Sequence, residues 1–525
     1  MSVGAVPSFL SLPRRRCGHN AAMTAAAQVA PATANRRRRL PPRFLPAPTV
    51  ARETPRYTKI VATIGPASED HLPELIDAGL SVARLNFSHG TADEHRRRMK
   101  KIRAASAERM TPVAVLADLP GPKMRTGTFP DGAIQLSVGQ EVRMRPGSHE
   151  AAPGEVNINV DDLLEAVHPG HRVLLADGQV LVEATAVEDG AIVGTVLRAG
   201  PVGNRKGVHL PDSDVHYELP TAEDRELIQL ARELDVDMLG ISFVGKSSEL
   251  EEIRGLAPGL QLVSKIERKS ALQNLDEILD ATDGVMVARG DLGVELDLEQ
   301  LPLVQKELLQ RSVRAGVFTI TATEMLESMI EAGRPTRAEV TDVANAVLDG
   351  TDAVMLSAET AVGKHPIGAV STMAKVAKAA ESSEIYRRRP RLAAGAERGF
   401  FSRATAMAAV HVANEVGVDR IVCFSETGNT VRLLSRFCPS AEIIALSPRP
   451  DTVRKMSVLA HVRPILFRRE ESLDAMIDTA ADLLQARGIV TEGDRVVFVA
   501  GVPVGFARST NVLKLHRIGE DARFA

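Results

Sequence analysis

The sequence has few cysteines, few aromatic residues and no long apolar run. Its three cysteines, Cys17, Cys423 and Cys438, show no metal-ligand spacing. So few in 525 residues exclude a disulfide scaffold and favour a reducing compartment. No run reaches the length of about 18 apolar residues that predicts a transmembrane helix. Aromatic residues make up 3 % and tryptophan is absent, so aromatic platforms for bases or sugars are not expected.

Excess charge of either sign is also missing. The chain has 64 Lys and Arg against 67 Asp and Glu, a net charge of −3, which gives no electrostatic case for binding nucleic acid. Residues 1–56 differ, with ten arginines, no lysine and a single acidic residue, Glu53. This Ala/Pro-rich segment has neither helical nor strand periodicity, so we predict a disordered basic extension. We expect a cytoplasmic protein; the alternative is organellar import through this extension.

What the sequence does contain is a series of short apolar runs, each followed by a helix-like segment. Near-continuous apolarity indicates strands buried on both faces of a parallel sheet. Eight such units predict an α/β protein built on a (β/α)₈ TIM barrel. Polar residues gather at the C-terminal end of each run, where barrel enzymes carry their chemistry. The runs are 59–65, 82–88, 113–119, 237–243, 261–267, 284–291, 318–323 and 353–358.

Two further regions interrupt or follow the barrel pattern. Residues 180–187 and 191–197 alternate apolar and polar around Asp189-Gly190, which predicts a β-hairpin inside an inserted all-β domain. After residue 386, helical patterns alternate with strands at 420–425, 442–447 and 495–500, which predicts a separate α/β domain. The expected division is 1–56 extension, 57–126 barrel, 127–217 inserted domain, 218–385 barrel and 386–525 C-terminal domain.

Charged residues at the predicted barrel mouth indicate a metal-assisted reaction. Glu267 and Asp291 end adjacent runs, so their carboxylates can converge on Mg²⁺, which takes few protein ligands. Lys265 lies two residues before Glu267 and so faces the same side of its strand. With Arg84 and Arg125 nearby, the pattern suggests phosphoryl transfer. These residue types predict a metal-assisted barrel enzyme and leave its reaction open.

Longer motifs add a resemblance that the composition does not give. Taken in order from about residue 57 to 519, they closely resemble the pyruvate kinase family. The resemblance implies a barrel, an inserted β-barrel lid and a C-terminal α/β regulatory domain. It also implies transfer of the phosphoryl group of phosphoenolpyruvate to ADP in glycolysis, Mg²⁺ or Mn²⁺, a phosphorylated allosteric effector and a homotetramer, without nucleic acid or membrane. The motifs are 63–68, 84–90, 264–267, 288–295, 322–329 and 355–361.

Matched by position, the resemblance assigns the catalytic centre. Glu267 and Asp291 hold the divalent metal. Lys265 offsets charge on the phosphoryl group in transfer, and Arg84 contacts the phosphate. Thr323 helps to bind the substrate carboxylate and orders the water that protonates the enolate. Glu324, where the family commonly has Gln, adds a charge beside Thr323.

The same resemblance assigns the remaining substrate contacts. The backbone of Arg289 and Gly290, next to Asp291, holds the carboxylate of phosphoenolpyruvate or pyruvate. The nucleotide side is formed by Asn86, His89, Arg125 and Lys206.

A monovalent-cation site is the main departure from the family pattern. K⁺-dependent members read Asp-Thr-Lys-Gly-Pro-Glu where this chain reads Asp118-Leu-Pro-Gly-Pro-Lys123. Leu119 removes a hydroxyl, and Lys123 replaces a negative charge by a positive one. Because two unit charges about 4 Å apart interact by about 4 kcal/mol at an effective dielectric of 20, we expect K⁺ not to be required. The remnant of the site is Asn86, Ser88, Asp118, Leu119 and Lys123.

An anion loop is expected in the C-terminal domain. Residues 425–430 follow a strand and precede a helix, where free N–H groups and the helix dipole favour phosphate. The resemblance places the effector phosphate at Ser425, Thr427, Gly428, Asn429 and Thr430. An ordinary helix cap is the alternative interpretation.

Two alternative functions remain at this point. A metabolite-sensing paralogue of the same fold with weak catalysis would be expected to lack a metal ligand or the lysine, yet Glu267, Asp291 and Lys265 are all present. Another barrel enzyme of phosphoenolpyruvate or pyruvate, such as an aldolase or carboxylyase, would not need the inserted and C-terminal domains.

Overall fold

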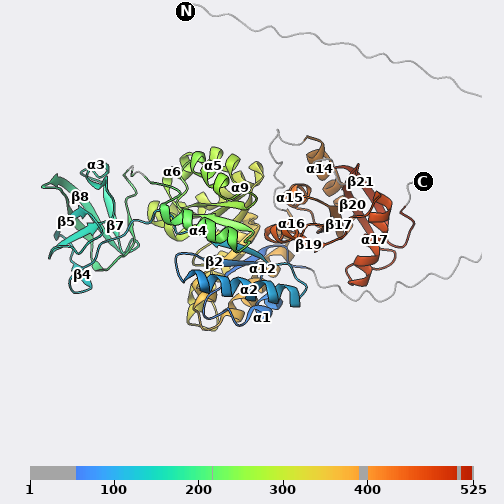
Figure 1. Cartoon of the computed structure of the whole chain (residues 1–525), viewed down its shortest axis with the longest axis horizontal. Helices are drawn as coiled ribbons and strands as arrows, with labels where there is room; N and C mark the ends of the chain where they lie inside the picture. Colours follow the sequence, from blue (N-terminus) through green and yellow to red (C-terminus); the bar gives the residue numbers. More distant parts are fainter. Residues whose placement is uncertain (1–54, 214, 216, 389–399, 505–509, 523–525) are drawn as a thin grey trace, which may run out of the picture. The chain divides into compact units, whose positions relative to one another are not determined.

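Eight parallel strands close into a barrel, as the eight apolar runs predict (Figure 1). In this computed structural model the described residues are 55–525 except 214, 216, 389–399, 505–509 and 523–525. The strands are hydrogen-bonded in the order β1, β16, β15, β14, β13, β12, β3, β2. They span β1 Lys59–Thr63, β2 Val82–Asn86, β3 Ala114–Asp118, β12 Met238–Ile241, β13 Gln261–Ile266, β14 Gly284–Ala288, β15 Phe318–Ala322 and β16 Ala353–Leu356.

Helices cover the outer face of the barrel strands, so the strands are buried on both sides. Several helices begin at a capping box, in which a threonine and an acidic residue three positions later satisfy each other's backbone N–H groups; Thr91 with Glu94 is one. The longer helices are α1 Leu72–Ala78, α2 Ala92–Glu108, α4 Ala222–Glu233, α5 Ser247–Leu256, α7 Leu275–Ala281, α9 Leu301–Ala315, α10 Arg337–Asp349 and α12 Pro366–Ser382.

One predicted strand is too long. The run 284–291 leaves the sheet at Ala288, and Arg289–Glu295 forms the short helix α8. Asp291 therefore lies in the first turn of a helix rather than at the end of a strand. The polar sequence Arg-Gly-Asp cannot continue a strand buried on both faces, and an acidic side chain is favourable at a helix N-terminus.

The inserted segment is an all-β domain with its own apolar core. The predicted hairpin is present as β8 Val180–Glu188 and β9 Ala191–Arg198. Asp189 and Gly190 turn the chain with φ of 49° and 69°, the two positive values that a type I′ turn requires. Its strands form a six-stranded sheet, β11-β7-β8-β9-β5-β6, and a two-stranded sheet, β10-β4. The other strands are β4 Ala133–Leu136, β5 Glu141–Pro146, β6 Glu155–Ile158, β7 Arg172–Leu175, β10 Gly200–Gly203 and β11 Val208–His209.

The C-terminal residues form a five-stranded sheet in the order β19-β18-β17-β20-β21. Strands β17 Arg420–Phe424, β18 Glu442–Ser447 and β20 Arg495–Gly501 were expected from the sequence. The edge strands β19 Val462–Leu466 and β21 Thr510–Arg517 were missed, because edge strands tolerate proline and exposed polar residues. The helices are α14 Phe400–Val416, α15 Asn429–Arg436, α16 Pro450–Lys455 and α17 Leu473–Ala486.

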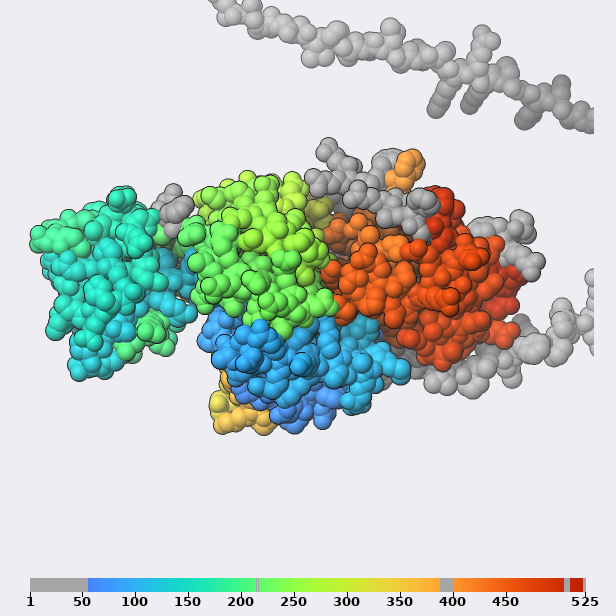
Figure 2. Space-filling view, in the orientation of Figure 1, coloured from blue at the N-terminus to red at the C-terminus, as the bar shows by residue number. Residues whose placement is uncertain are grey.

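The space-filling view shows closely packed side chains within the inserted domain (teal) and within the C-terminal domain (orange to red) (Figure 2). The predicted extension 1–56 lies almost wholly outside the described residues, as does most of the segment that follows α13 Glu384–Arg388. Within the described part, no helix is long and apolar enough to cross a membrane.

Candidate active site at the barrel mouth

A buried lysine lies among acidic and hydroxyl groups at the C-terminal ends of β3, β12 and β13. The Nζ atom of Lys265 lies 2.9 Å from Oε1 of Glu267 and 3.4 Å from Oδ1 of Asp118, and it donates to the Ser242 hydroxyl at 2.6 Å. Ser242 in turn donates to the Leu119 carbonyl at 2.8 Å. The predicted placement of Lys265 and Glu267 on one side of their strand is therefore confirmed.

Burial and charge set the ionisation of this cluster. Asp118 and Glu267 are each 1 % exposed. Burial alone would lower the pKa of Lys265, but the charges of Asp118 and Glu267 outweigh it and hold that pKa above its usual value. Burial would raise the pKa of Asp118, yet Lys265 and Arg84 hold it below its ordinary value. Both groups are therefore charged at neutral pH.

Glu267 is the carboxylate whose charge is least well compensated. Burial raises its pKa, the nearby charge of Asp291 raises it further, and Lys265 together with the Phe243 N–H, which donates at 2.7 Å, only partly offsets this. A buried carboxylate that is repelled by a second, half-buried carboxylate favours binding of a divalent cation. Among the described residues, no group of three or more His, Cys, Asp or Glu could hold a metal ion. A two-carboxylate donor set suits Mg²⁺, which completes its shell with water and substrate oxygens.

Arg84 is held across three neighbouring strands. Its Nε and Nη2 atoms lie 2.7 and 2.6 Å from Oδ2 of Asp118, and Nη1 donates to the Thr63 hydroxyl at 2.9 Å. Thr63 donates to the Leu356 carbonyl at 3.0 Å. The guanidinium is therefore fixed in direction before any substrate arrives, which is the preorganisation that transition-state stabilisation needs.

The loop after β15 has a strained backbone. Thr323 and Glu324 have φ of 67° and 54°, an uncommon conformation that is least favourable for a β-branched residue such as Thr323. The Gly290 N–H donates to the Thr323 hydroxyl at 2.8 Å, and Nη2 of Arg289 donates to the Thr323 carbonyl at 2.8 Å. Arg289 also pairs with Asp342 at 2.6 Å. These bonds hold Thr323 beside Gly290.

The expected nucleotide-side residues fall into two groups. Arg125 and Lys206 lie on paired segments at the base of the inserted domain, where the Thr126 N–H donates to the Lys206 carbonyl at 2.8 Å. Asn86 and His89 lie at and just after the end of β2. Within the described residues, no hydrogen bond or ion pair joins one group to the other.

Three side chains contribute contacts to the site that reasoning from the sequence did not predict. Ser242 and Thr63 were part of predicted strands with no sign that their hydroxyls bind Lys265 and Arg84. For Arg289, a role was expected only for the backbone, yet its side chain holds the strained loop. A polar residue at a strand end was the only available signal for all three.

Two family models cover most of the chain. The one described as pyruvate kinase, barrel domain, matches residues 55–370, and the one described as pyruvate kinase, alpha/beta domain, matches residues 403–516. The chain belongs to the pyruvate kinase family. It is 40 % identical over 478 residues to the pyruvate kinase of Geobacillus stearothermophilus and 39 % identical over 474 residues to that of Sporosarcina psychrophila. Each match covers 89 % of this chain and 81 % of the relative.

The five residues expected to remain from a monovalent-cation site are only partly brought together. Both oxygens of Asp118 lie against Arg84 or Lys265, and the Leu119 carbonyl accepts the Ser242 hydroxyl. The Asn86 side-chain oxygen accepts the Ser88 N–H at 3.2 Å. Lys123 is exposed, and its ammonium contacts none of the other described residues of this set.

The loop expected to bind an effector in this pyruvate kinase family member is a compact turn before α15. The Gly428 N–H donates to the Ser425 hydroxyl at 3.0 Å, and Gly428 has a φ of 80°. The buried Thr430 hydroxyl is hydrogen-bonded to that of Thr510 at 2.5 Å. Thr427 and Asn429 are exposed. Thr510, on an edge strand that the sequence did not reveal, is an unpredicted part of this loop's support.

Proposed function

We propose that this protein transfers the phosphoryl group of phosphoenolpyruvate to ADP, giving pyruvate and ATP, in the last step of glycolysis. The observation that carries the proposal is the buried ammonium of Lys265 within 3.4 Å of two carboxylates at the mouth of a barrel. In this step the bond between the enol oxygen and phosphorus breaks, a bond from phosphorus to a terminal ADP oxygen forms, and the enolate gains a proton on carbon. The supporting relatives carry the name pyruvate kinase.

In the proposed mechanism the chain binds, orients and neutralises charge. Glu267 and Asp291 would hold Mg²⁺ or Mn²⁺, which supplies positive charge to the transferring phosphate. Lys265 offsets charge on the phosphoryl group, and Arg84 orients its oxygens. Thr323 orders the water that protonates the enolate.

The remaining contacts hold the two substrates. The N–H groups of Arg289 and Gly290 bind the substrate carboxylate beside Asp291, and the Gly290 N–H exchanges its bond to the Thr323 hydroxyl for one to the carboxylate. Asn86 and His89, together with Arg125 and Lys206, bind ADP.

A coupled assay of pyruvate formation tests the proposal. The full chain should form pyruvate from phosphoenolpyruvate and ADP with Mg²⁺ or Mn²⁺, and chelation of the metal should abolish it. Absence of turnover together with tight binding of a phosphometabolite would instead support the sensing paralogue, which the intact ionic cluster does not favour.

We propose that K⁺ is not required. Lys123 adds a positive charge where K⁺-dependent members carry a negative one, and Leu119 lacks the hydroxyl ligand. Full activity is expected in tetramethylammonium or Tris buffer, and Lys123→Glu should gain K⁺ dependence because it restores the negative charge. Initial rates with and without K⁺ measure this, with Lys123→Gln as a control that removes charge only. Activation of the unmodified protein by about tenfold or more, equivalent to about 1.4 kcal/mol, would contradict it.

We propose that a sugar phosphate or nucleoside monophosphate binds at residues 425–430 and shifts the affinity for phosphoenolpyruvate. Such coupling is commonly about 1–3 kcal/mol, or about 5–150-fold. Thr427→Glu should abolish the shift, because a carboxylate repels the phosphate, whereas Thr427→Ser should retain it. Phosphometabolites are titrated against the half-saturating concentration of phosphoenolpyruvate. Equal activation of the glutamate variant and the unmodified protein would favour an ordinary helix cap.

Further properties are also proposed. The homotetramer and the regulatory role of the C-terminal domain rest on the family resemblance alone, whereas the cytoplasmic location rests on the low cysteine content and the domain division on the sequence patterns stated above. Light scattering at micromolar concentration measures whether the protein is a tetramer.

A further inference from the structure

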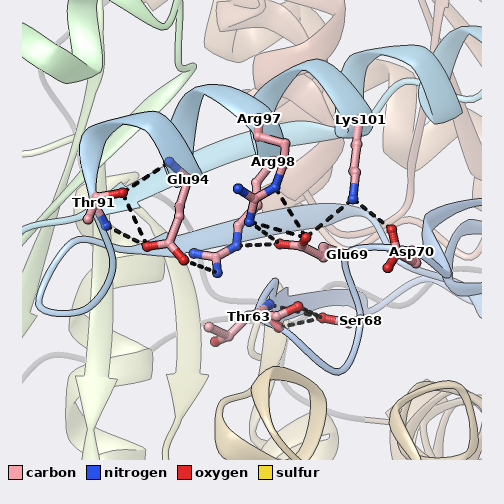
Figure 3. Close-up of polar contacts among 10 residues, drawn as sticks. Thr63, Ser68, Glu69, Asp70, Thr91, Glu94, Arg97, Arg98 and Lys101 are labelled. Atoms are coloured by element: carbon pink, nitrogen blue, oxygen red, sulfur yellow. Dashed lines mark hydrogen bonds and ion pairs between the residues drawn. The ribbon is translucent and has the colours of Figure 1, made fainter.

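A network of charges ties α2 to the loop that follows β1. Glu69 accepts hydrogen bonds from three cations of α2, Arg97 at 3.3 Å, Arg98 at 2.9 Å and Lys101 at 3.2 Å (Figure 3). Burial would raise the pKa of Glu69, but these bonds outweigh it and lower the pKa to about 2. The network is therefore ionised throughout the pH range in which a glycolytic enzyme works.

The loop that precedes Glu69 is held by hydrogen bonds and by close packing against Ala361. Ser68 is fully buried, and its hydroxyl accepts the Gly65 N–H at 3.0 Å. The α-carbon of Gly65 lies so close to the Ala361 backbone that a Cβ there would meet the Ala361 carbonyl oxygen at 2.4 Å. The Ala67 N–H donates to the same carbonyl at 3.0 Å. The start of this loop is therefore packed closely against Ala361, and Glu69 follows directly after it.

Arg98 links Glu69 to the first turn of α2, which directly follows the loop at His89 and Gly90. Its side chain is buried, and Nη2 lies 3.9 Å from Oε1 of Glu94, whose other oxygen accepts the Thr91 N–H at 2.7 Å (Figure 3). A Cβ on Gly90, which has a φ of 90°, would lie 3.3 Å from Nη1 of Arg98. The guanidinium therefore occupies the space that a side chain at position 90, next to His89, would need.

The loop at residues 89–91 packs against the protein on its inner side only. His89, Gly90 and Thr91 are all exposed. On the inner side, the buried ring of His95 packs against Phe87 with centroids 4.6 Å apart. Burial, and then the charge of Arg98, lower the pKa of His95, so this ring is neutral and adds packing but no ionic anchor.

We propose that Arg98 is a positioning residue for the nucleotide: by bonding Glu69 on the loop after β1 and pairing with Glu94 in the first turn of α2, it holds the adjacent His89 where it binds ADP. The inference rests on the proposed function, because that function assigns Asn86 and His89 to the nucleotide. Arg98 itself touches neither substrate. Its Nε donates to Glu69 while Nη2 faces Glu94, and a lysine, with a single nitrogen, could not reproduce both contacts.

The test compares Arg98→Lys with Lys101→Met. Both variants weaken the bonding of Glu69, but Lys101 does not reach Gly90 and pairs instead with Asp70. Arg98→Lys is expected to raise KM for ADP about tenfold, while KM for phosphoenolpyruvate and kcat stay within about twofold. Lys101→Met should leave all three within about twofold. Calorimetric titration with ADP should show the same loss of affinity in Arg98→Lys alone.

A milder variant protects the test against misfolding. Glu94→Gln keeps the capping box, since Gln also caps, but removes the charge that faces Arg98. It should raise KM for ADP in the same direction by a smaller factor. An equal rise in the two substrates' KM values for Arg98→Lys, or the same ADP affinity in all variants, would overturn the proposal. If the unmodified protein forms no pyruvate, the proposed function fails, and the ADP titrations still decide the role of Arg98.

Discussion

Lys265→Met is expected to lower kcat by about 10²–10³, equivalent to about 3–4 kcal/mol of transition-state stabilisation. The ammonium is preorganised between Glu267 and Asp118 and needs no reorientation when charge develops on the transferring phosphoryl group. Methionine has a similar length but no charge. Single-turnover and steady-state rates of pyruvate formation measure the effect.

Controls separate the catalytic loss from a loss of folding. Removing one partner of a buried ion pair can cost about 3–5 kcal/mol of stability, so circular dichroism and thermal unfolding accompany the assay. Asp118 keeps Arg84, and Glu267 keeps the Phe243 N–H, which favours a folded variant. Lys364→Met removes an exposed lysine paired with Glu331 and should change kcat by less than about twofold. A Lys265→Met rate within threefold of the unmodified protein would contradict the role.

Glu267→Gln is expected to weaken divalent-metal binding and to lower kcat by more than about 10²-fold. A bound metal supplies several kcal/mol of charge stabilisation in such reactions, and this substitution removes one of only two carboxylate ligands. The glutamine carbonyl can still accept the Phe243 N–H, so the local fold should persist. Mn²⁺ binding, followed by electron paramagnetic resonance, measures the metal affinity separately from the rate.

The chain offers a matched control for this second substitution. Glu324 lies beside Thr323 but is exposed, and glutamine is the common family residue there. Glu324→Gln should leave Mn²⁺ binding and kcat within about twofold. Unchanged Mn²⁺ affinity in Glu267→Gln would show that this carboxylate is not a metal ligand.

Part of the fold was predictable because burial imposes a pattern on each segment separately. The eight barrel strands, the hairpin around Asp189-Gly190 and three strands of the C-terminal sheet all follow from apolar runs and turn chemistry. The prediction of a strand to Asp291 was wrong: β14 ends at Ala288, because the polar Arg-Gly-Asp cannot continue a strand buried on both faces. The edge strands β19 and β21 were missed because a strand bonded on one side only needs no continuous apolar run.

The contacts of the candidate site are likewise of two kinds, those that the sequence predicts and those that only the tertiary structure shows. The sequence by itself determined that Lys265 and Glu267 share one side of a strand, because side chains alternate along a strand with a period of two. Only the tertiary structure decided that Asp118 and Ser242 complete the contacts of that lysine, since they lie at the ends of two other strands of the barrel. The contacts of Arg98 could not be predicted from the sequence either. From the sequence alone, an arginine on a helix is expected to be a solvated charge; the packing shows that this guanidinium lies between Glu69 on another segment and Glu94 on its own helix.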